Sequence, residues 1–231
     1  MNAVSFGKRA LAFHKSIEVP ADLPEGIQAM NPYGDARVRK YAQQFFNSFY
    51  SDDSPRTFVF GINPGRFGGG LTGIAFTDPV ALQSFCGIGN DLEKRRELSS
   101  EFIYKFIQQW GGPRKFYRDF FLTAVSPIGF IRDGVNCNYY DNPVLLAALK
   151  PFILRAVNAQ LSIGAYRGSA ILLGSGANLK FFADLNKAHG FFNTLYALEH
   201  PRFIMQYRRR RVADYLQKYS EVFTQALSAS C

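Results

Sequence analysis

Cysteines are few and scattered in this sequence of 231 residues. Cys86, Cys137 and Cys231 lie far apart and form no CxxC pair. This spacing excludes a four-cysteine zinc or iron–sulfur site within the chain and indicates reduced thiols. We also see no continuous apolar run as long as a membrane span. The first residues lack the apolar centre of a signal peptide and predict an amphipathic helix instead. We therefore expect a cytoplasmic, nucleoid-associated location in a bacterium, or a nuclear one in a eukaryote.

Acidic residues are also scarce. The chain has 18 Asp and Glu against 27 Lys and Arg, which gives a formal net charge of +9. A basic surface of this size suits a polyanion, and nucleic acid fits better than a membrane because no lysine-rich amphipathic terminus is present. The alternative that the charge serves only solubility stays open. Hydrophobic residues make up 47% of the chain and include 23 Phe, so we expect an aromatic-rich core.

Four short runs are apolar on both faces, which is typical of parallel strands covered by helices. They are residues 56–62, 119–125, 170–174 and 194–199. Helical patterns cover residues 35–50, 99–111, 143–166, 178–190 and 208–230. This alternation predicts an α/β fold, a three-layer α/β/α sandwich, in a single domain that spans residues 1–231. We interpret the Pro-punctuated stretch 19–32 as a surface loop.

Each predicted strand is followed by an unusual loop. The loops read NPGRFGGG from Asn63, SPIGF from Ser126, GSGAN from Gly174 and HPRF from His200. Because ligands bind outside the carboxyl ends of parallel strands, we expect all four loops to build one site. The glycine-rich loop lacks the Lys–Ser/Thr pair of a Walker loop and the pattern of a dinucleotide fingerprint, so a nucleotide cofactor is disfavoured.

Two side chains in these loops are candidates for chemistry. His200 ends a strand and precedes Pro201, while Asn63 stands in the glycine-rich loop. Either residue could instead have a structural role, since an Asn often caps its own turn and a lone His is often structural. Their expected position at the same edge of the sheet favours function.

The stretch GINPGRFGGGLTGIAF, residues 61–76, resembles the first motif of the uracil-DNA glycosylase superfamily. It matches the version found in the single-strand-selective monofunctional (SMUG) branch without a gap. The second motif of that superfamily begins with His-Pro, as does HPRF at His200, but the following RFIMQYRRRR departs from it. We identify the chain as a member of a divergent SMUG-like subgroup. The resemblance implies a four-stranded parallel sheet with strand order 2-1-3-4.

The resemblance also implies an activity: hydrolysis of the N-glycosidic bond of uracil in single- or double-stranded DNA, which leaves an abasic site. Asn63 would position the attacking water, and His200 would donate a hydrogen bond to the departing base. No metal or cofactor is expected, and the enzyme would act as a monomer. The motifs carry no obvious Lys nucleophile, which predicts a monofunctional glycosylase without lyase activity.

Base-binding residues follow from the same motifs. Those expected are Ile62, Gly65, Phe67, Gly68, Phe76, Ala124 and Ser126. Phe76 would stack on the flipped base, and the glycines would let the base approach the backbone. The family's uracil-reading Asn after the second strand is replaced here by Ala124, and Ser126 could compensate in part. We predict uracil removal with a less strict pocket that admits xanthine or hypoxanthine.

The segment after His200 is the candidate DNA contact. Wedge candidates, for the space that a flipped base vacates, are Arg202, Phe203, Ile204 and Met205. Arg66, Arg208, Arg209 and Arg210 are phosphate candidates. The run 208–211 is expected to begin the last helix, where bases oppose the helix dipole, and a solvated charge run is the alternative. Residues 92–97 are charge-balanced and predict a plain helix surface.

Two other functions stay open. One is a catalytically silent nucleic-acid-binding module on the same fold, which the presence of both Asn63 and His200 disfavours. The other is a small-molecule nucleotide hydrolase, which the lack of a carboxylate cluster for Mg²⁺ at the strand ends disfavours.

Overall fold

A parallel sheet of four strands forms the centre of the computed structural model, which describes residues 4–230. Strand β2 (Arg56–Gly61) pairs with β3 (Phe120–Ala124) on one side and with β6 (Ala165–Leu173) on the other. Strand β7 (Thr194–Leu198) pairs with β6 at the far edge. The resulting order, β3-β2-β6-β7, confirms the expected order 2-1-3-4.

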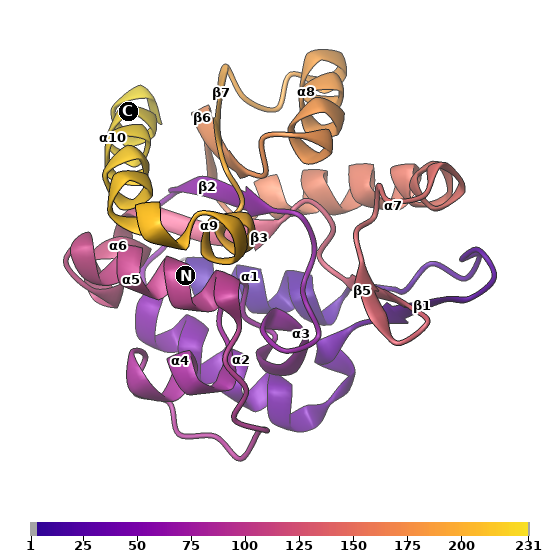
Figure 1. Ribbon diagram of the computed structural model, residues 1–231, viewed down its shortest axis with the longest axis horizontal. Coiled ribbons are helices and arrows are strands. Elements are labelled where there is room, and N and C mark those ends of the chain that lie inside the picture. Colours follow the sequence, from indigo (N-terminus) through magenta and orange to yellow (C-terminus); the bar gives the residue numbers. More distant parts are fainter. Residues whose placement is uncertain (1–3, 231) are drawn as a thin grey trace.

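Ten α-helices surround the strands in the described residues (Figure 1). They are α1 (Phe6–Lys15), α2 (Ala36–Phe49), α3 (Gly69–Thr72), α4 (Pro79–Ser84), α5 (Leu98–Gln109), α6 (Pro113–Asp119), α7 (Pro143–Leu161), α8 (Ala177–His189), α9 (Pro201–Tyr207) and α10 (Val212–Ser230). Two short 3₁₀ helices, η1 (Pro32–Gly34) and η2 (Arg209–Arg211), precede α2 and α10.

Aromatic side chains pack the helices against both faces of the sheet. On one face, Phe58 and Phe121 contact Phe6 of α1, and Phe60 contacts Phe182 of α8. On the other face, the ring of Phe120 packs edge-on against Trp110, beyond the end of α5, and against Phe223 of α10. Alternate residues of a strand point to opposite faces, so these contacts define three layers, α/β/α. The core is rich in Phe, as the composition predicted.

Helix α7 differs from the expectation that no apolar run reaches the length of a membrane span. Its 19 residues are long and apolar enough to cross a membrane by length and composition alone. In this fold, however, one side of α7 is part of the core. Its buried residues are Leu145, Leu149, Phe152, Ile153, Ala156, Val157, Gln160 and Leu161. The helix also continues through Pro151.

A second, antiparallel sheet was not predicted. It consists of β1 (Ile27–Met30), β4 (Gly129–Arg132) and β5 (Val135–Cys137), in the order β1-β4-β5. Residues 19–32 are therefore not a plain surface loop. Strands of three or four residues are too short to give an alternating pattern, but the β4–β5 turn carries a sequence signal. Asp133 and Gly134 both have positive φ, 51° and 72°, as a two-residue type I′ hairpin turn requires.

The last helix begins later than the expected residue 208, and a short helix before it was not predicted. Residues 201–207 form α9, the three arginines of η2 follow, and α10 begins only at Val212. Arg208–Arg211 therefore do not begin the final α-helix, as expected from the sequence. Basic side chains at a helix N-terminus oppose the dipole, and α10 instead carries Asp214 in its first turn, where a negative charge is favourable.

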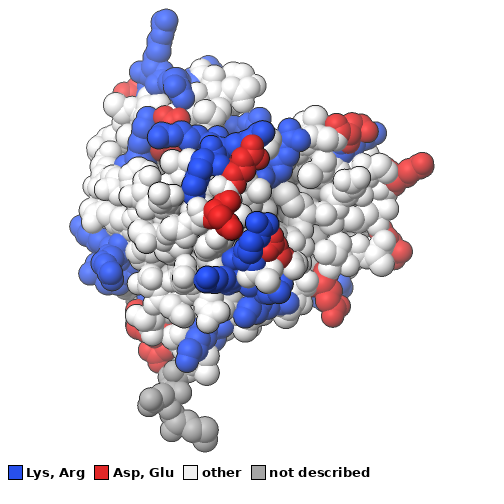
Figure 2. Space-filling view, turned by 90° about the horizontal axis from the view of Figure 1, so that it is seen from below, with Lys and Arg blue, Asp and Glu red and all other residues white. Residues whose placement is uncertain are grey.

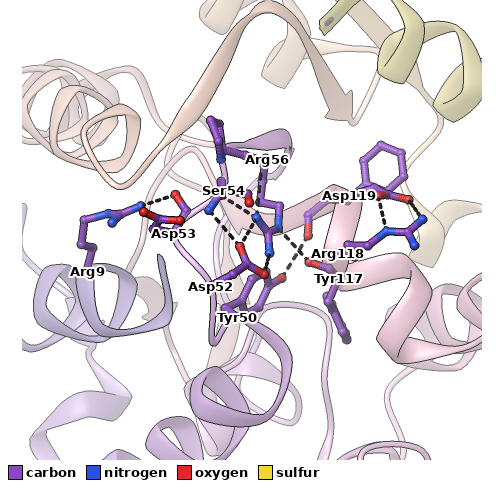
Figure 3. Close-up of polar contacts among 11 residues, drawn as sticks. Arg9, Tyr50, Asp52, Asp53, Ser54, Arg56, Tyr117, Arg118 and Asp119 are labelled. Carbon is purple, nitrogen blue, oxygen red and sulfur yellow. Dashed lines mark hydrogen bonds and ion pairs between the residues drawn. The ribbon is translucent and has the colours of Figure 1, made fainter. Parts of the chain in front are cut away.

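One buried arginine belongs to the structural framework and not to the basic surface. Arg56 begins β2, at the opposite end from the loops of interest, and its side chain is fully buried. Figure 3 shows its polar contacts. Its guanidinium donates to both carboxylate oxygens of Asp52, at 3.0 and 2.9 Å, and to the carbonyl of Tyr117 at 3.1 Å. These hydrogen bonds lower the pKa of Asp52 to about 2. The cluster joins the amino end of β2 to α6 and the preceding loop.

Candidate active site

The glycine-rich loop after β2 folds back on itself so that Phe76 covers the end of the strand. Phe76 has a positive φ of 54°, which is uncommon for a bulky residue. A Cβ atom on Gly61 would lie 2.6 Å from Cζ of the Phe76 ring, so only glycine fits beneath it. The turn is held by Thr72, whose hydroxyl donates to the carbonyl of Thr77 at 2.6 Å. The loop therefore fixes an aromatic ring at the carboxyl end of the sheet.

The second sheet fixes the side chain of Asn63. Its Nδ2 donates to the carbonyl of Cys137 at 3.3 Å, and its Oδ1 accepts from the backbone N–H of Tyr139 at 3.2 Å. Both partners lie at the end of β5 or just beyond it. These two contacts assign the amide orientation and leave Oδ1 a second lone pair, with which it can accept a hydrogen bond from a water.

His200 lies at the N-cap of α9, directly after β7 and its flanking Glu199. Its Nδ1 accepts a hydrogen bond from the backbone N–H of Arg202 at 3.2 Å. Burial, and then the nearby Arg202 guanidinium, lower the pKa of His200 to about 4. The imidazole is therefore neutral at pH 7 and carries its proton on Nε2, which makes it a hydrogen-bond donor without a charge.

Asn63 and His200 line the same cavity, which has a volume of about 450 Å³. This lies within the range of about 300–1,000 Å³ for small-molecule sites. The ring of Phe76 is in the wall, 5.8 Å from that of His200. The other residues predicted for base or DNA contact that reach this cavity are Ile62, Gly65, Ala124, Arg202 and Phe203. Of the four predicted loops, NPGRFGGG and HPRF line this cavity, whereas SPIGF does not reach it and GSGAN lines a neighbouring cavity, so the expectation that all four loops build one site was wrong.

Three predicted base-binding residues lie elsewhere. Ser126 is fully buried, and its hydroxyl donates to the carbonyl of Ile128 at 2.9 Å, so it cannot compensate for Ala124. The ring of Phe67 lies between two guanidinium groups, 4.6 Å from that of Arg66 and 4.7 Å from that of Arg95. Gly68 faces the carboxyl group of Glu97, which fills the space above it. The room that the glycines leave is therefore taken in part by a side chain.

Comparisons with known proteins agree with this geometry. The model of the uracil DNA glycosylase superfamily matches residues 48–224. The chain belongs to this superfamily. A search of curated proteins gave no match. Among solved structures, the chain is similar to the wild-type SMUG2 of Pedobacter heparinus, with 37% sequence identity and a TM-score of 0.93. The alignment covers 96% of this chain and 98% of that one. The chain is thus a SMUG-type member of the uracil DNA glycosylase superfamily, as its motifs indicated.

The sequence of this uracil DNA glycosylase superfamily member gave no indication of two polar residues in the cavity. Glu97 precedes α5 in a stretch, 92–97, that is irregular and not the plain helix surface expected. Asn136 lies on β5, where its Oδ1 accepts from the backbone N–H of Arg66 at 3.2 Å. The Asp-Gly turn could have placed Asn136 on a hairpin, but no local signal points to Glu97.

The residues proposed as wedges differ in how much of each side chain is exposed. Ile204 and Met205 are 0% and 3% exposed, so neither can enter DNA without leaving the core. Phe203, in contrast, is 39% exposed at the rim of the cavity. Tyr207, which the sequence did not suggest, is 60% exposed, and its ring centroid lies 5.6 Å from that of Phe203. An exposed aromatic pair therefore borders the cavity of this glycosylase.

The arginine candidates differ in their partners. Arg209 forms an ion pair with Glu101 at 3.3 Å, and Arg208 lies over the ring of Phe203 at 5.4 Å. Arg210 has no side-chain partner within residues 4–230 and is exposed. The guanidinium of Arg66 donates a hydrogen bond to the carbonyl of Gly134. On the face shown in Figure 2, basic side chains outnumber acidic ones and gather over the middle of the surface.

Proposed function

We propose that this protein is a monofunctional DNA glycosylase that hydrolyses the bond between uracil and deoxyribose and leaves an abasic site. One observation carries the proposal: an anchored amide, Asn63, and a neutral imidazole donor, His200, line one cavity that is large enough for a nucleobase. Membership of the superfamily supports a glycosylase-type hydrolase. We further propose that the protein acts as a monomer on DNA, in the cytoplasm of a bacterium, associated with the nucleoid, or in the nucleus of a eukaryote.

Phe76 and His200 have different roles in breaking the glycosidic bond. The base must leave the stack and enter the cavity, where the ring of Phe76 can lie against its face. As the bond to C1′ lengthens, positive charge develops on the sugar and negative charge on the base. Nε2–H of His200 stabilises the negative charge by a hydrogen bond that strengthens in the transition state.

Asn63 holds the water that attacks C1′. An amide oxygen is too weak a base to remove a proton early. This is sufficient when bond breaking runs ahead of attack, because the sugar cation is then a strong electrophile. The two backbone contacts of Asn63 keep its oxygen in one position and so lower the entropic cost of holding the water.

The base pocket is expected to be permissive. Ala124 lines the cavity at the end of β3 but has no polar side-chain group to read a base edge. Ser126 is turned away. We therefore propose that xanthine and hypoxanthine are removed as well as uracil, because the residue that would reject them is absent.

DNA is held by the exposed residues around the cavity. We propose that Phe203 and Tyr207 fill the gap in the stack and that Arg202, Arg208 and Arg210 contact the backbone. The GSGAN loop, at the N-terminus of α8, borders a neighbouring cavity of about 480 Å³ that also contains Arg208. This arrangement suits a phosphate group next to the flipped nucleotide.

The competing function is a silent nucleic-acid-binding module. The experiment that separates the two incubates the protein with oligonucleotides that carry uracil, xanthine or hypoxanthine and then cleaves abasic sites with alkali. Cleavage at the modified base supports the proposal. Binding without cleavage for all three bases contradicts it.

A further inference from the structure

Glu97 lines the cavity, and a hydrogen bond of its backbone N–H fixes its position. Its N–H donates to Oδ2 of Asp78 at 2.9 Å. Asp78 is 3% exposed and also accepts from the N–H of Ala81 at 2.7 Å, so this anchor is buried and rigid. The Glu97 side chain then extends over the glycine-rich loop. A Cβ atom on Gly65 would lie 2.7 Å from Oε1 of Glu97, and one on Gly68 would overlap Oε2.

The Glu97 carboxyl group has no hydrogen-bond partner in the described part of the chain, although it lines the cavity. Some of the other polar groups there are already engaged. Both polar atoms of the Asn63 amide contact backbone, and Thr123 donates to Gln160. A polar group that is half-buried and unpaired is available to a ligand, and leaving it unpaired has an energetic cost.

We propose that Glu97 is a specificity-determining residue that hydrogen-bonds the flipped base and reads its carbonyl oxygen. This inference rests on the proposed function. Uracil, hypoxanthine and xanthine share a carbonyl group next to a ring N–H. A neutral carboxyl group offers one donor and one acceptor side by side, which matches that pair. An ionised carboxylate only accepts, so it would repel the base oxygen. Glu97 thus supplies the polar contact that Ala124 cannot.

The surroundings of Glu97 keep its carboxyl group protonated in a large fraction of the molecules near neutral pH. Burial, and then the negative Asp78 at the start of α4, raise the pKa of Glu97 to about 7, while Arg202 on α9 opposes this. The other charged side chains nearby are engaged elsewhere. Arg66 faces the carbonyl of Gly134, and Arg95 pairs with Glu93 at 2.6 Å. Because the neutral form reads the base, its contribution is present below pH 7 and is lost as the pH rises above it.

A different role for Glu97, as a general base that activates water, would require the ionised form. The structure favours the reading role because Asn63 is already oriented as a hydrogen-bond acceptor for a water, whereas Ala124 has no polar side-chain group with which to read the base edge. The two roles predict opposite pH dependence. Reading makes excision slower as the pH rises through 7, whereas water activation makes it faster.

The test is single-turnover excision of uracil from an oligonucleotide, with enzyme in excess, between about pH 6 and pH 8.5. We compare wild type, Glu97→Gln, Glu97→Ala and the matched control Glu93→Gln, an exposed residue outside the cavity. Wild type and the control should slow about tenfold per unit well above pH 7. Glu97→Gln should lose less than tenfold at pH 6 and show no alkaline loss, because an amide keeps a donor and an acceptor at every pH. Glu97→Ala should lose about 10- to 100-fold at pH 6.

A wild-type rate that rises with pH, or a Glu97→Ala rate equal to wild type, would overturn the reading role while leaving the glycosylase function intact. A lack of excision by wild type at every pH would instead contradict the proposed function, and the inference with it. Thermal unfolding will show whether Glu97→Ala folds. If it does not, the near-isosteric Glu97→Gln gives the answer: a rate that stays constant with pH supports the reading role, and a rate that falls above pH 7 as in wild type contradicts it.

Discussion

The backbone N–H of Arg202 donates a hydrogen bond to Nδ1 of His200 at 3.2 Å. This contact means that Nδ1 carries no proton, so the proton of the neutral ring is on Nε2. The same turn brings the Arg202 guanidinium close enough to disfavour a positive charge on the ring. One turn of backbone therefore sets both the tautomer and the charge of the proposed donor.

We predict that His200 stays neutral, with its proton on Nε2, from pH 7 down to about pH 4. Nitrogen-15 NMR of the histidine side chains measures both properties, and the His200→Ala spectrum assigns the signals. In the unfolded chain the group titrates near its usual value of 6.5 and binds a proton first. It therefore lowers the stability of the folded state as the pH falls from 6.5 towards 4. A midpoint near 6.5 in the folded protein, or a proton on Nδ1, would refute this account.

Ala124→Asn should narrow the base preference. Ala124 lines the cavity at the end of β3, so an amide there can form two hydrogen bonds with the edge of uracil. We expect the ratio of uracil to xanthine excision, measured as kcat/KM, to rise by about tenfold or more. Ala124→Leu is the matched control, because it adds similar bulk without polar atoms. Equal ratios in wild type and Ala124→Asn would remove the argument for a permissive pocket.

Arginines near the cavity should differ in their effect on DNA affinity. Arg208→Ala and Arg210→Ala should each weaken binding of all sequences and reduce the slope of log K against log salt by about 1. Arg211→Ala is the control, since Arg211 already forms an ion pair with Asp214 at 2.9 Å. Fluorescence anisotropy over a salt series measures the slopes. If the slopes of wild type and the Arg208→Ala and Arg210→Ala variants coincide, the arginines do not contact phosphates.

Phe203→Ala should reduce excision from duplex DNA by about tenfold or more and excision from single strands much less. The exposed ring fills the gap left by the base, and unstacking has a cost of a few kcal/mol in a duplex. Single-turnover rates on matched single- and double-stranded substrates give the comparison. Gln217→Ala, an exposed residue of α10 outside the cavity, is the control. Equal losses on both substrates would argue against a wedge.

The central sheet was predictable because its strands are buried and leave long apolar runs. The same rule placed Asn63 and His200 together, since the carboxyl ends of parallel strands meet at one edge. The β1-β4-β5 sheet was missed because its strands hold only three or four residues and β1 pairs with β4, which is distant in the sequence. The arginine run was placed at the start of the last helix because Arg209–Arg211 lead directly into that helix, although they form the separate 3₁₀ helix η2.

The remaining errors concern tertiary contacts. Nothing in the sequence near Glu97 shows that the backbone N–H of Glu97 bonds to Asp78, the N-cap of α4. Similarly, Ser126 and Ile204 lie in the right motifs, but packing turns them into the core. Motifs thus identified which loops form the site, whereas the direction of each side chain depended on the fold.

The most direct test of the central claim is the rate of abasic-site formation in a uracil oligonucleotide by wild type, Asn63→Ala and His200→Ala. We predict excision by wild type and losses of about 100- to 1,000-fold in each variant, because each removes one group that acts in the transition state. Thermal unfolding and DNA binding should change little. Wild-type rates in both variants, with the fold intact, would contradict the account.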